Sequence, residues 1–235
     1  MKGDRKKIVF LTGAGISAES GITTFRDSGG LWEQYKVEDV ASIEGYYRNP
    51  QLVTNFYNER RNQLMEVEPN EAHRLVALLE EKYDVCVVTQ NVDDLHERAG
   101  STNIIHLHGE LRKITSSRNP NDPSQIATLP RGTNITYPDD RAKDGSPARP
   151  FIVWFGEAVP MIEPAAEQVG TADILVVVGT SLNVYPAAGL LNYARSDAQI
   201  YLIDPSPANV PQYMNIHIIA KKATEGMREL YEELM

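Results

Sequence analysis

Cysteine is nearly absent from this chain, in which Cys86 is the only one among 235 residues. A single thiol can form neither an intrachain disulfide nor a cage of several thiolates around a metal. Cys86 lies inside the apolar run Val85 to Val88, so we interpret it as a buried core thiol.

Long apolar runs and an excess of positive charge are also missing. No segment approaches the roughly 18 apolar residues of a membrane span, and the start Met-Lys-Gly-Asp-Arg-Lys-Lys leads into a strand pattern rather than a secretory signal. We therefore expect a cytoplasmic protein with no membrane partner. The net charge is -9, whereas phosphate contacts need clustered Lys and Arg. This balance argues against nucleic acid as a partner and suits basic peptides better.

Short apolar runs recur along the chain and are typical of strands covered on both faces. The six runs are Ile8 to Leu11, Val85 to Val88, Ile104 to Leu107, Ile174 to Val178, Ile200 to Ile203 and Ile216 to Ile219. Helical patterns lie between several of them. They cover Pro50 to Met65, Glu71 to Glu81, Ala187 to Ala194 and Thr224 to Leu234. This alternation predicts an α/β fold with a doubly wound, mostly parallel sheet.

Two segments break the alternation of strand and helix. Ser20 to Asn70 contains a Gly-Gly loop, and Leu111 to Pro150 is polar, carries six of the 14 prolines and has no convincing period. We expect both to form a smaller inserted module beside the sheet. Residues 1–235 would then be one catalytic domain. Its large part would cover about 1–26, 71–110 and 151–235, and the small module about 27–70 and 111–150.

A glycine turn follows the first predicted strand, within the stretch TGAGISAESGITTFR from Thr12 to Arg26. Gly13-x-Gly15-x-x-Ala18 fits the dinucleotide fingerprint, in which backbone N–H groups and a helix start hold a phosphate. The same short pattern also occurs in ordinary strand-turn-helix corners. A dehydrogenase would add an acidic residue about 20 positions later, at the end of a second strand. Glu33 instead follows a Gly-Gly loop, which weakens the case for hydride transfer.

Polar motifs follow four further predicted strands, at the edge where open α/β sheets bind their ligands. They are Thr89-Gln90-Asn91-Val92-Asp93, His108-Gly109-Glu110, Gly179-Thr180-Ser181 and Asp204-Pro205-Ser206. His108 is the best candidate base among the five histidines, because it follows a strand and precedes a glycine that lets a ligand approach. His73 and His96 lie in helical patterns and suit structural or surface roles. His106 and His108 could form a metal pair, but that spacing is a weak signal and no third ligand is evident.

The order and spacing of these motifs resemble the sirtuin family, the NAD-dependent protein-lysine deacylases. The matching segments are TGAGIS with GITTFR, TQNVDDLHERAG, LHGEL, WFGEAVP and GTSLNVYPAAG. The resemblance implies a Rossmann-like domain with a small module, and a cleft between them for NAD and an acyl-lysine peptide or protein. NAD would be consumed as a co-substrate, which yields nicotinamide, O-acyl-ADP-ribose and free lysine.

The resemblance also implies roles for single residues. The catalytic base would be His108, acting beside Gln90 and Asn91. Residues near the phosphates and ribose of NAD would be Gly13, Ala14, Gly15 and Ala18. The nicotinamide end would meet Ile22, Phe25, Arg26, Gln90, Asn91 and Asp93, and the adenosine side Gly179, Thr180, Ser181, Asp204 and Ala223. The lysine channel and peptide backbone would meet Val153, Phe155, Gly156, Glu157 and Val184, which without the other motifs suit a core strand edge.

One departure from the family concerns zinc. Most sirtuins hold a structural zinc with two Cys-x-x-Cys pairs between the His-Gly and Phe-Gly-Glu motifs, but this interval has no cysteine. Ser116 and Asn119 have the spacing of one pair, yet a neutral hydroxyl and amide cannot replace thiolates on zinc. We expect no zinc and no other metal. The segment Leu111 to Pro150 would fold without one, helped by proline stiffness, which lowers the entropy lost on ordering.

A second departure from a plain deacetylase concerns the acyl group. Tyr57 and Arg60, three residues apart, project from the same face of a predicted helix. A phenol beside a guanidinium is a good carboxylate receptor, although the run Glu59, Arg60 and Arg61 also suits a solvated charged face. The pair resembles the Tyr-x-x-Arg of class III sirtuins, which remove succinyl and malonyl groups. Ala41 matches the small residue that gives the acyl pocket room. We expect a desuccinylase and demalonylase with some deacetylase activity.

Two other functions use the same sequence features. A mono-ADP-ribosyltransferase or NAD hydrolase would share the NAD site without needing Tyr57 and Arg60. A non-catalytic NAD-binding module is made plausible by the missing zinc cage. The presence of Gln90, Asn91, Asp93 and His108 argues against this last function.

Overall fold

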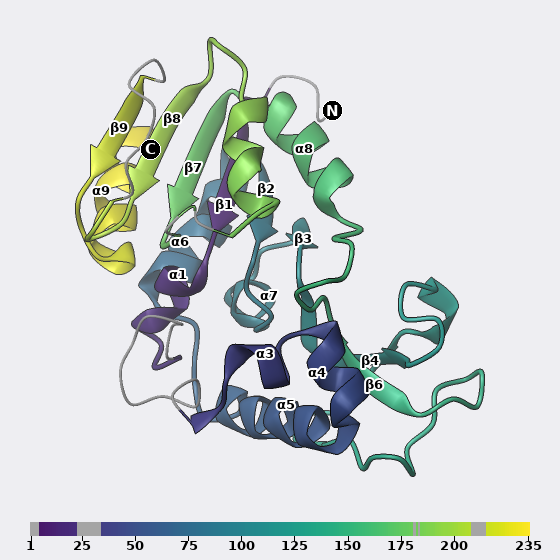
Figure 1. Ribbon diagram of the computed structural model, residues 1–235. Coiled ribbons are helices and arrows are strands. Elements are labelled where there is room, and N and C mark those ends of the chain that lie inside the picture. Colours follow the sequence, from purple (N-terminus) through teal and green to yellow (C-terminus); the bar gives the residue numbers. More distant parts are fainter. Residues whose placement is uncertain (1–4, 23–33, 181, 183, 208–214) are drawn as a thin grey trace.

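The computed structural model describes residues 5–22, 34–180, 182, 184–207 and 215–235. Its larger part is built on a parallel sheet (Figure 1). Within these residues the sheet has six strands, ordered β3-β2-β1-β7-β8-β9. They are β1 (Lys7–Thr12), β2 (Asp84–Thr89), β3 (Ile104–His106), β7 (Ile174–Val178), β8 (Gln199–Ile203) and β9 (Ile216–Ile219). Every neighbouring pair is parallel. The predicted doubly wound, Rossmann-like fold is confirmed.

The strand order reverses at β1. From β1 the chain adds β2 and β3 on one side, and it then returns to add β7, β8 and β9 on the other. Thr12, at the end of β1, is level with Thr89 of β2 and Val178 of β7. Open α/β sheets bind ligands outside the carboxyl ends of strands at such a switch point. The fold therefore directs attention to the segments that follow these three strands.

Helices cover both faces of the sheet, and this explains the continuously apolar strands. Ile8 and Phe10 of β1 face a core that includes residues of α1 (Ala14–Ala18), α6 (Glu71–Leu78) and α9 (Ala223–Leu234). The alternating residues Val9 and Leu11 face a second core with α8 (Ile162–Gly170) and η3 (Ala187–Tyr193). Cys86 is fully buried in that second core, where the sequence predicts it.

The helices begin and end close to the predicted bounds. The residue before α6 is Asn70, whose side chain accepts a hydrogen bond from the Ala72 N–H while its own N–H donates to His73 Nδ1. This reciprocal capping fixes the start of the helix, which ends in the 3₁₀ turn η1 (Leu79–Glu81). The segment predicted around residues 187–194 is also a 3₁₀ helix, η3. None of the helices in the described ranges is both long and apolar enough to cross a membrane.

The smaller module lies next to the carboxyl ends of the large sheet (Figure 1). It contains α3 (Val37–Val40), α4 (Ile43–Arg48), α5 (Pro50–Leu64), η2 (Pro123–Gln125) and, in the described residues, an antiparallel sheet ordered β5-β4-β6. These strands are β5 (Ala127–Thr128), β4 (Gly109–Ser116) and β6 (Ala148–Ile152). The sequence did not reveal β4 and β6, because the register between them shifts between Gly109 and Ile114 and so breaks the two-residue period.

One carboxylate connects several loops of the small module. Asp144 accepts hydrogen bonds from Ser116 Oγ at 2.6 Å, Ser146 Oγ at 2.7 Å and Asn119 Nδ2 at 3.3 Å. These bonds hold the pKa of Asp144 below its ordinary value of 3.8. Ser116 and Asn119, which have the spacing of a cysteine pair, therefore meet at an ionised carboxylate.

We expect Asp144→Asn to lower the melting temperature by a few degrees at pH 7, because the amide replaces one accepting oxygen with a donor. Asp139→Asn, at an exposed neighbouring position, is the matched control in calorimetry. Because the folded-state pKa of Asp144 is depressed, its contribution is present above about pH 3.9 and is lost as the pH falls through the lower value. Wild type and variant should therefore converge in acid. A fall in the wild-type melting temperature on adding EDTA would show that a metal holds this module.

Candidate active site

The glycine turn joins β1 to α1 and lies directly against the segment after β7. The Gly13 N–H donates to Val178 O at 3.0 Å, and the Gly15 N–H donates to Gly179 O at 2.8 Å. A Cβ on Gly15 would lie 2.6 Å from Gly179 Cα, and one on Gly13 would lie 2.7 Å from Thr180 Cβ. The two glycines are thus required first for backbone packing. The turn therefore lies against Gly179 and Thr180, and Ala14 and Ala18 are the first and last residues of α1, which follows it.

The segment after β2 is bonded to the same turn. Gln90 Nε2 donates to Thr180 Oγ1 at 3.1 Å. Asn91 Nδ2 donates to Gly13 O at 3.1 Å and to Ser17 Oγ at 3.2 Å. The carboxyl ends of β1, β2 and β7 therefore meet through named side-chain contacts, and the side chain of Asn91 is buried among them.

A buried chain of polar groups lies beneath these amides. Ser17 Oγ donates to Asp93 Oδ2 at 3.0 Å and lies 3.4 Å from His73 Nε2. Because His73 Nδ1 accepts from the Asn70 N–H, Nε2 carries the ring hydrogen and donates to Ser17. Burial lowers the pKa of His73 to about 4, so this ring is neutral at pH 7. Burial also raises the pKa of Asp93, against the hydrogen bonds that it accepts.

His73 is therefore linked to the site, although its helical pattern indicated only a structural or surface role. The available signal was Asn70, three residues earlier, which forms the helix cap through the same ring. His96 is buried as well, with Nε2 at 3.2 Å from Thr12 Oγ1. His96 contacts Thr12 at the end of β1, and His73 contacts Ser17 of α1, so both rings lie against the segments on either side of the glycine turn.

His108 lies between β3 and β4 with one ring nitrogen engaged. Its Nδ1 is 3.1 Å from Gln90 O. Since a carbonyl only accepts, Nδ1 carries the hydrogen and Nε2 keeps its lone pair. Among the described residues, no hydrogen-bond partner reaches Nε2. Burial lowers the pKa of His108 below 6.5, although the Gln90 bond opposes this shift. His108 is thus a neutral imidazole at pH 7, suited to accept a proton.

The segment after β6 connects the site to the small module. The Val153 N–H donates to His108 O at 3.0 Å, and the Phe155 N–H donates to Ala41 O at 2.9 Å. The Phe155 side chain is 53% exposed and that of Val184 is 37% exposed, so both are accessible to a peptide. Gly156 is exposed beside them.

Glu157 has a different environment from its neighbours. Its carboxylate accepts two hydrogen bonds from Arg149, at 2.8 and 2.9 Å, and one from the Trp154 N–H at 2.9 Å. Arg149 is buried and its Cζ lies 3.7 Å from the Trp154 ring centroid. Glu157 therefore stabilises its own turn, and we expect peptide contacts from the residues around it rather than from this carboxylate.

Tyr57 and Arg60 lie together on α5. Tyr57 is 2% exposed and Arg60 is half-buried, with Arg60 Cζ at 6.0 Å from the Tyr57 ring centroid. Burial lowers the pKa of Arg60, while Tyr57 and Asp93 oppose this shift. Burial also raises the pKa of Tyr57, which stays a neutral phenol. The guanidinium is thus partly desolvated and is not part of a fully solvated face. Ala41 is buried as well.

Three of the remaining predicted positions lie within the described residues. Asp204 follows β8, is buried, and accepts a hydrogen bond from the Ser206 N–H at 2.8 Å. Ala223 is the buried first residue of α9, and Ile22 packs against the core of the small module. Phe25, Arg26 and Ser181 lie outside the described residues.

Amide, hydroxyl, carboxylate and imidazole groups therefore converge at the switch point, which suits the amide and ribose groups of a dinucleotide. Fold and site together define a Rossmann-like dinucleotide-binding protein. The family model described as the Sir2 family matches residues 13–186. The chain belongs to the Sir2, or sirtuin, family, and the predicted membership is confirmed.

Similar proteins cover almost the whole chain. A protein of Bacteroides thetaiotaomicron named "NAD-dependent protein deacylase" is 58% identical over 98% of both chains. A protein of Helicobacter pylori with the same name is 50% identical, again over 98% of both. A solved Sir2 homolog–NAD complex is 38% identical, with a TM-score of 0.86 over 98% of this chain and 90% of that one. A solved Sir2 protein with a deacetylated p53 peptide and 3'-O-acetyl ADP-ribose is 31% identical, with a TM-score of 0.79 over 98% and 94%.

We expect His108→Asn to reduce NAD-dependent turnover of an acyl-lysine peptide by about 10²–10⁴-fold, because Asn can donate to Gln90 O but cannot act as a base. Its melting temperature should stay near that of wild type. Since the pKa of His108 is depressed, wild-type kcat should rise through a midpoint below pH 6.5 and be level at pH 7. Steady-state rates between pH 5 and 8 measure this limb. A midpoint above 6.5 would contradict the assignment of His108 as the base.

Proposed function

We propose that this chain is an NAD-dependent protein-lysine deacylase that prefers acidic acyl groups, such as succinyl and malonyl, and retains deacetylase activity. One observation carries the reaction: the neutral imidazole of His108 bonds the Gln90 carbonyl through Nδ1, which leaves the lone pair on Nε2, while the side chains of Gln90 and Asn91 bond Thr180 and Gly13. Membership in the Sir2 family and relatives named NAD-dependent protein deacylases support the same activity.

Different residues of this chain have different roles in the proposed reaction. NAD supplies the ribose carbon from which nicotinamide leaves, so it is consumed rather than regenerated. Gln90 and Asn91 orient the nicotinamide ribose, and His108 accepts a proton from a ribose hydroxyl through Nε2. The strand segment around Val153 and Phe155, together with Gly156 and Val184, guides the acyl-lysine peptide. The acyl oxygen of the substrate would take the place of nicotinamide on that ribose carbon, and one water is consumed, so the products are nicotinamide, O-acyl-ADP-ribose and free lysine.

The preference for acidic acyl groups rests on the environment of Arg60. Arg60 is half-buried beside the buried Tyr57, and a guanidinium next to a phenol is a good carboxylate receptor. A succinyl or malonyl carboxylate can accept two parallel hydrogen bonds from Arg60 and one from the Tyr57 phenol. An acetyl group has no carboxylate and gains none of these bonds. The buried Ala41 leaves room for the longer acyl chain.

We also propose that the enzyme is cytoplasmic, that its partners are acylated proteins, and that it uses neither zinc nor nucleic acid. The single buried cysteine and the net charge of -9 support these expectations. The Asp144 cluster supports a small module held together without metal.

Product identification tests the reaction class. The protein is incubated with NAD and matched succinyl, malonyl and acetyl peptides, and the products are analysed by mass spectrometry. We expect O-succinyl-ADP-ribose together with free lysine. ADP-ribosylated protein or peptide would indicate a mono-ADP-ribosyltransferase, and free ADP-ribose without deacylation an NAD hydrolase. Absence of turnover despite NAD binding would indicate a non-catalytic module.

We expect Arg60→Met to lower kcat/KM for succinyl-lysine by about tenfold to a hundredfold, because hydrogen bonds to a charged partner are lost. Acetyl-lysine should be affected much less. Arg60→Lys keeps the charge without the planar fork and should give an intermediate loss. Arg131→Met, at an exposed position of the small module, is the matched control. Equal losses on succinyl and acetyl peptides would count against the carboxylate receptor.

A further inference from the structure

Two histidines at the end of β3 contact the segment that carries Gln90 and Asn91. His106 is the last residue of β3, and His108 lies two residues later, in the bend before β4. His106 Nδ1 lies 3.1 Å from Asn91 O, and His108 Nδ1 lies 3.1 Å from Gln90 O. The two rings therefore bond the carbonyls of consecutive residues, and each Nδ1 carries a hydrogen because a carbonyl only accepts.

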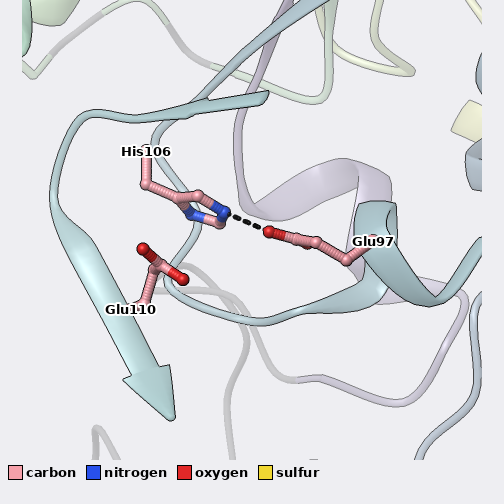
Figure 2. A group of neighbouring side chains, drawn as sticks. All are labelled: Glu97, His106 and Glu110. Carbon is pink, nitrogen blue, oxygen red and sulfur yellow. Dashed lines mark hydrogen bonds and ion pairs between the residues drawn. The ribbon is translucent and has the colours of Figure 1, made fainter. Parts of the chain in front are cut away.

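The two rings differ at the other nitrogen. His106 Nε2 lies 2.7 Å from Glu97 Oε1, a carboxylate supplied by α7 (Leu95–Ala99) (Figure 2). Because both partners of His106 are acceptors, both of its nitrogens carry hydrogen and the ring is an imidazolium. Burial lowers the pKa of His106, but the hydrogen bond and charge of Glu97 outweigh burial and raise it above 6.5.

A second acidic group completes this cluster. Glu110 lies on the other side of the His106 ring from Glu97 (Figure 2), and the ligand atoms of the three residues are within 4.8 Å of one another. Such a group could meet a metal ion. However, Glu110 Oε1 accepts from Lys113 Nζ at 2.6 Å, and both nitrogens of His106 are engaged. These contacts favour a proton between Glu97 and His106 over a metal ion.

Resting on the proposed function, we propose that His106 is a positioning residue which, held by Glu97, fixes the backbone carbonyl of Asn91 and with it the Asn91 amide. That amide bonds Gly13 O and Ser17 Oγ, so a shift of the Asn91 backbone moves a group at the glycine turn. His106 cannot replace His108 as the base, because Glu97 occupies its Nε2.

The contact with Asn91 has a defined pH dependence. When the imidazolium loses a proton, ionised Glu97 stabilises the hydrogen that remains on Nε2. The hydrogen on Nδ1 is therefore the one that is lost. Two acceptors, Nδ1 and Asn91 O, then face each other. The contact is therefore intact at low pH and is lost as the pH rises through the folded-state pKa. The other charged or titratable groups around the ring are His96 from α7, Asp93 from the preceding loop, and Glu110 and Lys113 from β4.

Two substitutions of His106 separate its two hydrogen bonds. His106→Asn places an amide N–H near the position of Nδ1 and keeps the bond to Asn91 O, whereas His106→Gln places one near Nε2 and keeps only the bond to Glu97. We expect His106→Asn to keep kcat/KM for NAD within about threefold of wild type, and His106→Gln to lose about tenfold or more. Rates are measured with the full chain, NAD and a succinyl-lysine peptide, alongside each melting temperature.

Glu97→Gln tests the role of the carboxylate. The neutral amide can donate to Nε2, so an uncharged His106 keeps its hydrogen on Nδ1 and still bonds Asn91 O. We expect the alkaline fall of kcat/KM for NAD in wild type, followed from pH 6 to 9, to be absent or shifted upward in Glu97→Gln. A purely structural ion pair would lower the melting temperature without moving this limb.

Several outcomes would overturn the proposal. These are equal losses in His106→Asn and His106→Gln, an unchanged alkaline limb in Glu97→Gln, or one zinc ion per chain that dialysis against Zn²⁺ loads into wild type but not into His106→Gln. Failure of the proposed function is distinguishable, since wild type would then release no deacylated lysine from any acyl peptide. In that case NAD affinity at pH 7, measured by calorimetry, still compares the two His106 variants and tests the positioning role.

Discussion

The close contact between two backbone turns sets the geometry of the whole site. Gly15 and Gly179 approach until a side chain on either would overlap the other, and Gly179 also adopts a φ of +62°, which favours glycine. This contact brings the end of β1 against the end of β7. Gln90 and Asn91 then reach across to Thr180 and Gly13. Without this contact, the polar groups that follow β1, β2 and β7 would not lie together at the switch point.

Much of the chemistry comes from the way histidines are paired rather than from their number. His73, His106 and His108 all have one ring nitrogen fixed by the backbone. Burial makes His73 and His108 neutral at pH 7, whereas Glu97 keeps His106 charged. His73 Nδ1 accepts a hydrogen bond from a backbone N–H, whereas Nδ1 of His106 and of His108 donates to a backbone carbonyl. The same residue type thus has three different environments within one region, which suit the separate roles proposed for these rings.

The sequence predicted the large sheet well and the small module poorly, for a physical reason. Strands such as Ile174–Val178 are covered on both faces, so burial alone makes them apolar throughout. In β4 the register shift removes that signal, and its residues Gly109 to Ser116 are mostly polar. At the site, motif order located His108 and Asn91, but the link from His106 to Glu97 joins separate elements and is visible only in three dimensions.

The residues of the proposed acyl receptor and those of the glycine turn belong to different parts of the fold. Tyr57 belongs to the hydrophobic core of the small module, while Gly13, Asn91 and Gly179 follow strands of the large sheet. Arg60 projects from a helix whose packing is maintained by other side chains, such as Val53 and Phe56. With the proposed receptor on α5, single substitutions there would change the acyl group that is accepted without altering the segments that follow β1, β2 and β7. Divergence in substrate choice within such a scaffold requires no redesign of its reaction.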